Sequence, residues 1–127
     1  MKYLSNTLAA LLGLLFVAGS LFYFFGKTPP DPFPAGSPPS LFMGVMMPTG
    51  YMTFVKVGEL VGGILVAFPR TRNFGLLVLG PICINILCFG IFLMKGVGLA
   101  NPLTIFITVV PLFLLWVGRA RFAALAN

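Results

Sequence analysis

The chain is poor in the residues that carry metal, thiol or acid–base chemistry. It has no histidine, two acidic residues (Asp31 and Glu59) and two cysteines among 127 residues. Cys83 and Cys88 are five positions apart in one apolar run, so a helix turns them to different faces, more than about 7 Å apart and too far for a disulfide. We interpret them as packing residues. The absence of CxxC and metal-ligand spacings argues against catalytic metal or thiol–disulfide chemistry within this chain.

Charge is also scarce, because charged residues make up 8% of the chain and hydrophobic residues 59%, with a mean hydropathy of +1.07. Soluble domains carry about 25% charged residues. We therefore predict an all-α integral membrane protein, a single domain over residues 1–127 with the lipid bilayer as its solvent. The net charge of +6 does not indicate nucleic acid, because the basic residues flank apolar runs and fix orientation there.

Four apolar runs predict a bundle of four transmembrane helices, spanning about residues 4–25, 49–68, 74–94 and 103–117. The first could instead be a signal peptide, with a weak cleavage site before Ser20. Its apolar run continues to Phe25, however, so we expect an uncleaved helix. Thr49, Asn73 and Asn101 are the expected N-caps of the later helices.

The longest segment outside these spans is "GKTPPDPFPAGSPPS", residues 26–40. Six prolines in fifteen positions exclude a helix there and favour extended or turn backbone. The run 41–47, "LFMGVMM", is apolar but too short to span, and Pro48 separates it from the second span. We expect a short interfacial or re-entrant helix packed on the loop side.

Basic residues are distributed unevenly over the predicted connections. Four spans place both termini on one side, together with five basic residues, whereas only Lys27 and Lys95 lie on the other side. By the positive-inside rule both termini are expected in the cytoplasm, and the proline-rich loop outside it. The five basic residues on the terminal side are Lys2, Arg70, Arg72, Arg119 and Arg121.

Lys56 and Glu59 lie inside the second predicted span, where an isolated charge costs at least about 2.5–3.5 kcal/mol. Glu59 falls near the middle of the span, and Lys56 about 4.5 Å nearer the outer side. The two residues are three positions apart, share an inward face and can form an ion pair. Glycines nearby, Gly58, Gly62 and Gly63, permit close helix approach. The pair is either a structural ion pair or a proton- or ligand-handling site.

Asn85 lies near the middle of the third span and is the second polar group of the predicted interior. A hydrogen bond between Glu59 and Asn85 would satisfy both groups, although Asn85 could serve helix packing alone. Pro81 precedes it by one turn and frees a backbone carbonyl. Residues of the fourth span could line the same interior, namely Thr104, Thr108 and Pro111. Tyr23 and Trp116 are expected to be anchors at the membrane interface.

Two stretches of this sequence carry a resemblance to a known family. They are "GKTPPDPFP" after the first helix and "TGYMTFVKVGELVGGILVAFPRTRNFGLLVLGPICINILCFGIFL" through the second and third. The chain resembles the DoxX-like family of small four-helix bacterial membrane proteins. Gly90 departs from the family, in which many members carry histidine there. The matching positions are Tyr51, Lys56, Glu59, Gly63, Pro81, Asn85 and Phe89.

The resemblance implies a place in the bacterial cytoplasmic (inner) membrane and an association with redox metabolism. The family is similar to DoxD, the membrane subunit of thiosulfate:quinone oxidoreductase. The resulting hypothesis is a membrane subunit that binds a quinone or another small apolar ligand, with no covalent cofactor and no enzymatic activity by itself. Its ligand- or proton-handling candidates are Lys56, Glu59, Asn85 and Tyr51.

Two further hypotheses stand beside this one. The chain could be a scaffold or assembly factor, with the proline-rich loop and the run 41–47 as its docking surface. It could also be a small transporter, for which one four-helix unit offers little room unless it oligomerises. The first two hypotheses require a partner membrane protein or membrane-associated protein, or a homo-oligomer.

Overall fold

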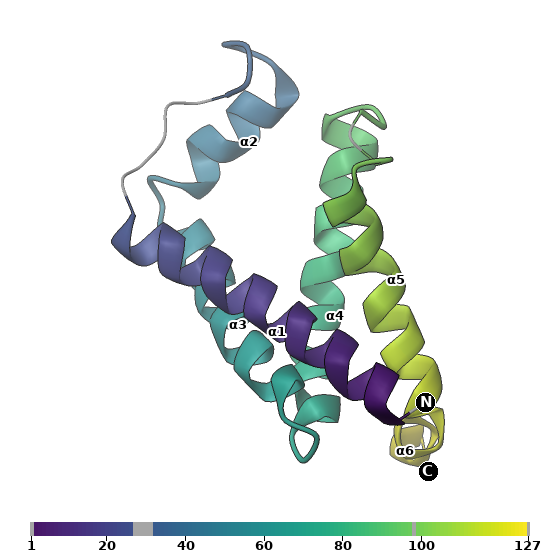
Figure 1. Cartoon of the computed structure of the whole chain (residues 1–127). Helices are drawn as coiled ribbons and strands as arrows, with labels where there is room; N and C mark the ends of the chain where they lie inside the picture. Colours follow the sequence, from purple (N-terminus) through teal and green to yellow (C-terminus); the bar gives the residue numbers. More distant parts are fainter. Residues whose placement is uncertain (1, 27–31, 98, 127) are drawn as a thin grey trace.

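The computed structural model of the protein describes residues 2–26, 32–97 and 99–126. Within these ranges the fold is all-helical and contains no strand (Figure 1). The elements in chain order are α1 (Lys2–Phe25), α2 (Pro38–Met46), α3 (Tyr51–Ala67), α4 (Arg72–Cys88), the π-helical turn η1 (Phe89–Leu93), α5 (Pro102–Val117), α6 (Arg119–Ala123) and the 3-10 turn η2 (Ala124–Ala126). Lys27 and most of the "GKTPPD" stretch lie outside the described residues.

Two helical segments are each long and apolar enough to cross a membrane, namely α1 and the continuous stretch Arg72–Leu93. Helices α2 and α3 add a third if they are counted together as one span, bent by 83°. The fourth predicted span is α5, an apolar helix of 16 residues. At 1.5 Å per residue it is about 24 Å long, against the hydrocarbon thickness of about 30 Å.

Two helices begin at residues other than those predicted from their expected N-caps. The predicted cap at Thr49 is wrong, because Thr49 Oγ1 donates to the Val45 carbonyl at 2.6 Å and ends α2 instead. Gly50, with φ of 83°, is the N-cap of α3, and this left-handed conformation favours glycine. The cap at Asn73 is also wrong, because α4 begins at Arg72. Asn101 is confirmed, since its Oδ1 accepts from Leu103 N at 2.9 Å.

The backbone of helix α3 lies close to the backbones of both α1 and α4. On the α1 side, a Cβ added to Gly13 would collide with the Gly63 carbonyl oxygen and lie 2.9 Å from Ala67 Cβ. On the α4 side, a Cβ on Gly75 would collide with the backbone of Val66, and one on Gly62 would lie 2.7 Å from Leu79 Cδ2. The predicted close approach at the small residues of α3 is therefore confirmed.

Side chains of α1, α3, α4 and α5 form one hydrophobic core in the half of the molecule that contains the termini. The helices converge there and diverge toward α2 (Figure 1). The core comprises Ala9, Leu12, Phe16, Val66, Leu76, Leu79, Cys83, Ile107, Val110 and Leu114. Cys83 is thus a packing residue, and both cysteines are free.

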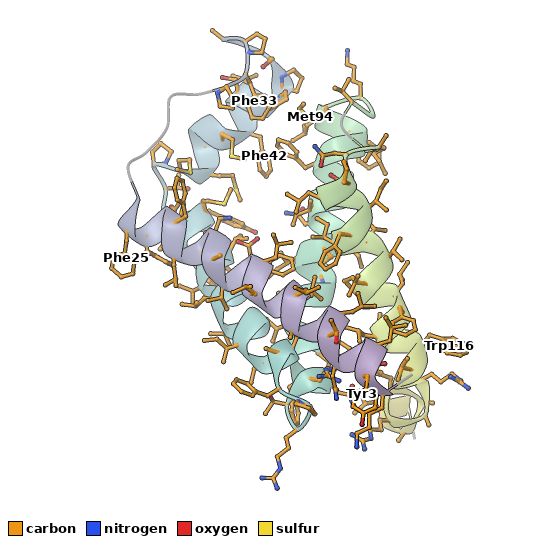
Figure 2. All side chains as sticks on the ribbon, in the orientation of Figure 1. Tyr3, Phe25, Phe33, Phe42, Met94 and Trp116 are labelled. Atoms are coloured by element: carbon orange, nitrogen blue, oxygen red, sulfur yellow. The ribbon has the colours of Figure 1, made fainter. Side chains whose placement is uncertain are left out.

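Arg72 joins three helices at this end of the molecule. Its Nε donates to the Val66 carbonyl at 3.2 Å, and its Nη1 donates to Asn6 Oδ1 at 3.0 Å. Trp116 and Tyr3 lie at the same end, whereas Phe33, Phe42 and Met94 lie at the opposite end (Figure 2). Tyr3 is 85% exposed and Trp116 56% exposed, as expected for aromatic residues at an interface.

The glycine contacts predict a clear difference between two substitutions in α1. Gly13→Ala should destabilise the fold by about 1–3 kcal/mol, because the added methyl group meets backbone that cannot move away. Gly19→Ala is the matched control, since nothing lies within 4 Å of a Cβ there, and alanine should instead add helix propensity. Thermal unfolding in detergent checks both; equal melting temperatures for the two variants would contradict the packing described.

Candidate functional site

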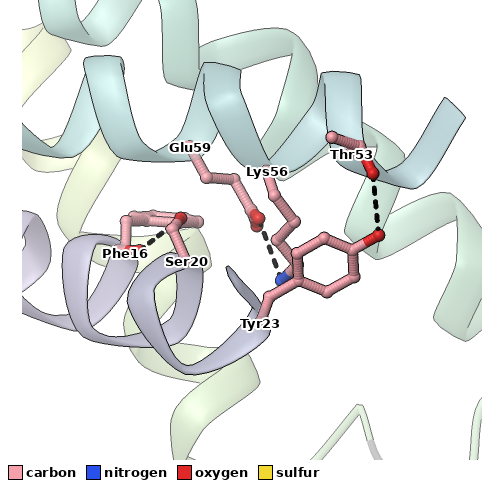
Figure 3. A network of polar contacts seen from close by, with 6 residues as sticks. All are labelled: Phe16, Ser20, Tyr23, Thr53, Lys56 and Glu59. Carbon is pink, nitrogen blue, oxygen red and sulfur yellow. Dashed lines mark hydrogen bonds and ion pairs between the residues drawn. The ribbon is translucent and has the colours of Figure 1, made fainter. Parts of the chain in front are cut away.

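Helix α3 carries the only charged pair in the described part of the chain. Lys56 Nζ lies 3.0 Å from Glu59 Oε2, and the side chains are 25% and 8% exposed. The three-residue spacing sets both groups on one face of the helix, as predicted. Figure 3 shows this face opposite α1, from which Ser20 and Tyr23 point toward it.

The Glu59 carboxylate is incompletely satisfied in spite of this ion pair. Oε2 is buried, and no donor, the Lys56 ammonium included, reaches it with hydrogen-bond geometry. The pair is therefore a close contact of opposite charges without a directed hydrogen bond. This carboxylate can accept a hydrogen bond from a ligand or a water molecule, and it can take up a proton.

Polar groups of α1 that face this region already have partners. Ser20 Oγ is buried and donates to the Phe16 carbonyl at 2.8 Å. The Tyr23 hydroxyl lies 3.0 Å from Thr53 Oγ1, which joins α1 to α3 near Lys56 (Figure 3). Tyr23, expected only as an interface anchor, thus also fixes the end of α3 that carries the pair.

A cavity of about 240 Å³ opens beside the charged pair, between α2, α3, α4 and η1. It brings together Lys56, Glu59 and Asn85, three of the four residues that the sequence singles out. The rest of its wall is apolar and rich in methionine and phenylalanine. These residues are Phe42, Met43, Met46, Met52, Val55, Ile82, Ile86 and Phe89.

Asn85 lies on the α4 wall of the cavity with its side chain exposed. The predicted hydrogen bond between Asn85 and Glu59 is not formed, because within the described residues the polar partner of Glu59 is Lys56. The cavity lies between them instead, since the helices diverge at this end. Its wall thus offers an ammonium, a carboxylate and a carboxamide.

Helix α2 closes this cavity from the side of the proline-rich loop. The Phe42 ring packs edge-on against Phe89 of η1, with centroids 5.3 Å apart, and Phe33 lies 6.1 Å from the same ring. Met46 is buried. The short helix expected within residues 41–47 is present as α2, and its inner side lines the cavity. It begins earlier, at Pro38, so the prediction that residues 26–40 contain no helix is wrong at their end, because proline is tolerated in the first turn of a helix.

Four other residues expected in the interior lie outside the cavity wall. Tyr51 is 58% exposed at the start of α3 and packs on Phe54, with ring centroids 6.4 Å apart. Of the fourth-span residues, Pro111 is buried, and Thr108 Oγ1 donates to the Thr104 carbonyl at 2.8 Å. The structure therefore brings Lys56, Glu59 and Asn85 together around one cavity, and Tyr51 does not line it.

Most of the apolar wall was not predicted, above all the residues of α2. Phe42, Met43 and Met46 follow the i, i+1, i+4 spacing of one helix face, which is the signal that the sequence offers. The run was expected to form a short interfacial or re-entrant helix on the loop side, and a docking surface only under the scaffold hypothesis. No local pattern shows which residues of such a helix line a cavity with α3 and α4.

Gly90, the departure from the family resemblance, lies in η1. A Cβ at this position would come within 2.9 Å of Leu99 Cδ2. The Leu99 side chain thus occupies the space into which a larger residue at position 90 would extend. The position at which the predicted resemblance implies a histidine in many relatives is therefore glycine beside an apolar side chain.

Comparisons with known proteins do not assign a family to this chain. No protein-family model, no curated protein and no solved structure matches it. The DoxX-like resemblance therefore stays a prediction from the sequence. The functional proposal depends on the cavity and its polar groups.

The ion pair makes a prediction about stability. Lys56→Met should destabilise the fold by about 1–3 kcal/mol, because it leaves a buried carboxylate without its cation. This loss is smaller than that for a fully buried ion pair, because Lys56 is partly exposed. The double variant Lys56→Met/Glu59→Gln should recover most of that loss. Equilibrium unfolding of the four combinations in detergent measures the coupling, and strictly additive effects would show that the pair contributes nothing.

Proposed function

We propose that this chain is a multi-pass protein of the bacterial cytoplasmic membrane, with a DoxX-like bundle of four spanning helices. The support is the pair of helical segments long enough to span, together with the bent α2–α3 pair and the apolar α5. Side chains that face outward from α3 and α5 are large and apolar, which suits lipid. Examples are Phe54, Ile64, Val109 and Leu112.

The distribution of basic residues supports an orientation for this bundle. Both termini lie at one end of the molecule, together with the turn between α3 and α4 (Figure 1). Lys2, Arg70, Arg72, Arg119 and Arg121 belong to that end, and Lys95 to the other. The positive-inside rule then places the termini in the cytoplasm and the cavity toward the outer face.

The site supports the binding of a small, mainly apolar ligand with carbonyl oxygens, for which a quinone head group is the candidate. The observation that carries this proposal is the cavity of about 240 Å³ in which Lys56, a buried Glu59 and an exposed Asn85 meet an apolar wall. Ligand pockets combine an apolar lining with a few convergent polar groups in this way. Pockets for drug-sized ligands have volumes of about 300–1,000 Å³. This cavity is smaller, so its volume suits a ligand with a single ring.

Each polar group has a distinct role in this proposal. Lys56 donates a hydrogen bond to a carbonyl oxygen of the ring, and Asn85 orients the ring from the opposite wall. Glu59 carries the proton that such an oxygen takes up on reduction. The electrons must come from a partner protein, so the chain acts as a membrane subunit of a quinone-linked redox system and is not an enzyme by itself.

A second candidate function is that of a scaffold or assembly factor. The observation in its favour is the outer face of α2, where Leu41, Val45 and Met47 are exposed while Phe42 and Met46 face inward. An exposed apolar face of this kind is adaptable and can bind a partner protein. In this case the ion pair is purely structural and the cavity binds no ligand.

The proposed orientation predicts the behaviour of reporter fusions in bacteria. A fluorescent protein at the C-terminus should fluoresce, because that end is cytoplasmic. A phosphatase that is active only outside the cytoplasm should be active when inserted at Gly36, which is exposed and has φ of 81°. The reverse pattern would show that the basic end faces outward.

The proposed ligand site predicts a change in ligand-induced stabilisation. A short-chain quinone analogue should raise the melting temperature of the wild-type protein in detergent. Lys56→Met/Glu59→Gln and Asn85→Leu should each weaken binding about tenfold, which corresponds to the loss of one good hydrogen bond or about 1.4 kcal/mol.

Tyr51→Phe is the matched control for this experiment, because Tyr51 lies on the same helix outside the cavity wall and should bind the analogue as the wild type does. A quinone shift that survives in the double variant would place the ligand elsewhere. Absence of a shift in every protein, including the wild type, would favour the scaffold function.

A further inference from the structure

A second pocket, of about 260 Å³, lies at the end of the molecule that contains both termini. It is formed by the turn before α4, the first turns of α4 and the C-terminal segment α6–η2. Its lining combines two arginines with apolar side chains. The residues are Arg70, Asn73, Phe74, Leu77, Arg121, Phe122 and Leu125.

Gly118 joins α5 to α6 beside the start of α4. A Cβ at Gly118 would lie 3.1 Å from Asn73 Oδ1 and 3.4 Å from Phe122 Cε2, so a side chain at this position would crowd both neighbours. The amide of Phe122 donates to the Gly118 carbonyl at 3.3 Å, and the Phe122 ring packs against the core. These contacts hold α6 so that Arg121 lines the same pocket as Arg70.

The arginines at this end of the molecule differ in their partners. Arg72 is buried in part and donates from Nε to Val66 and from Nη1 to Asn6, while its Nη2 is buried without a hydrogen-bond partner among the described residues. Arg119 donates from Nη1 to the Trp116 carbonyl at 2.8 Å and lies 4.5 Å from the centre of the Trp116 ring. Arg70 and Arg121 are exposed, and within the described residues neither guanidinium takes part in a hydrogen bond or ion pair.

No carboxylate side chain neutralises these two groups in the described part of the chain, where Glu59 is the one acidic residue and belongs to the other cavity. Within the described residues, the pocket therefore carries two positive charges without a neutralising side chain, next to an apolar wall. On that wall Phe74 is 66%, Leu77 49% and Leu125 69% exposed.

We propose that this pocket binds the phosphate-containing head group of an anionic phospholipid. Guanidinium groups bind phosphate through paired, charge-assisted hydrogen bonds. Basic pockets between membrane helices on the cytoplasmic side suit such head groups, and the exposed apolar wall suits the attached acyl chain. This inference depends on the membrane placement proposed above, with the termini in the cytoplasm, but not on the quinone site.

The test uses the full-length protein, purified in a neutral detergent, and native mass spectrometry with defined lipids. Phosphatidylglycerol should be retained in preference to phosphatidylcholine. Arg70→Gln/Arg121→Gln should lower the affinity for phosphatidylglycerol about 10- to 30-fold, as expected for two charges worth about 1 kcal/mol each. Arg119→Gln is the matched control, because it removes an exposed arginine at the same end that does not line the pocket, and it should retain the lipid.

Leu125→Ser separates a lipid site from a site for free phosphate. It keeps both arginines and should weaken phosphatidylglycerol retention, because the acyl chain loses part of its wall. The proposal would be overturned in favour of a soluble anion by two results together. Inorganic phosphate would displace phosphatidylglycerol as effectively as added phosphatidylglycerol does, and Leu125→Ser would not change lipid retention. Equal lipid retention by Arg70→Gln/Arg121→Gln and Arg119→Gln would overturn it as well.

Two controls keep this test interpretable. Circular dichroism verifies folding of each variant, and the single variants Arg70→Gln and Arg121→Gln replace the double variant if that one does not fold. The reporter fusions test the membrane orientation in a separate experiment. A wrong lipid-site proposal can therefore be distinguished from a wrong membrane placement.

Discussion

The backbone-close packing of α3 between α1 and α4 determines most of this structure. Gly63 and Ala67 face Gly13 on one side, and Gly62 faces Leu79 on the other. Helices that approach this closely gain dispersion energy, and neighbouring backbones exclude lipid and water from the contact. The helix held most firmly is therefore the one that carries Lys56 and Glu59, and the energy of packing can offset the cost of burying a charge there.

Beyond Gly63 toward α2 the helices diverge, and the same segment α3 passes from a packed core into a cavity wall. Val66 belongs to the core, whereas Met52 and Val55 line the cavity. The charged pair lies at this boundary. A site at such a boundary has a rigid base and a wall that is free of close packing, which is the arrangement that a ligand pocket requires.

Sequence patterns were enough to place the main helices and the polar trio, because both depend on local signals. Apolar runs of fixed length predict helices, and the three-residue spacing of Lys56 and Glu59 predicts their contact. The fold-back of α2 and the position of Tyr51 were not predictable in this way, because they depend on the 83° bend after Thr49 and on contacts between distant segments. The predicted cap at Thr49 failed because its hydroxyl donates to the Val45 carbonyl, and the one at Asn73 failed because α4 begins one residue earlier, after Thr71.

The contact between Gly90 and Leu99 links two positions on either side of the turn that follows η1. A side chain at position 90 would meet the end of the Leu99 side chain, which would have to shift to make room for it. In homologues they should therefore vary together: a larger residue at the first position requires a smaller or displaced residue at the second. Introducing a histidine at the first position alone would thus test packing and not chemistry, and covariation between the two sites would identify the relatives that share this turn.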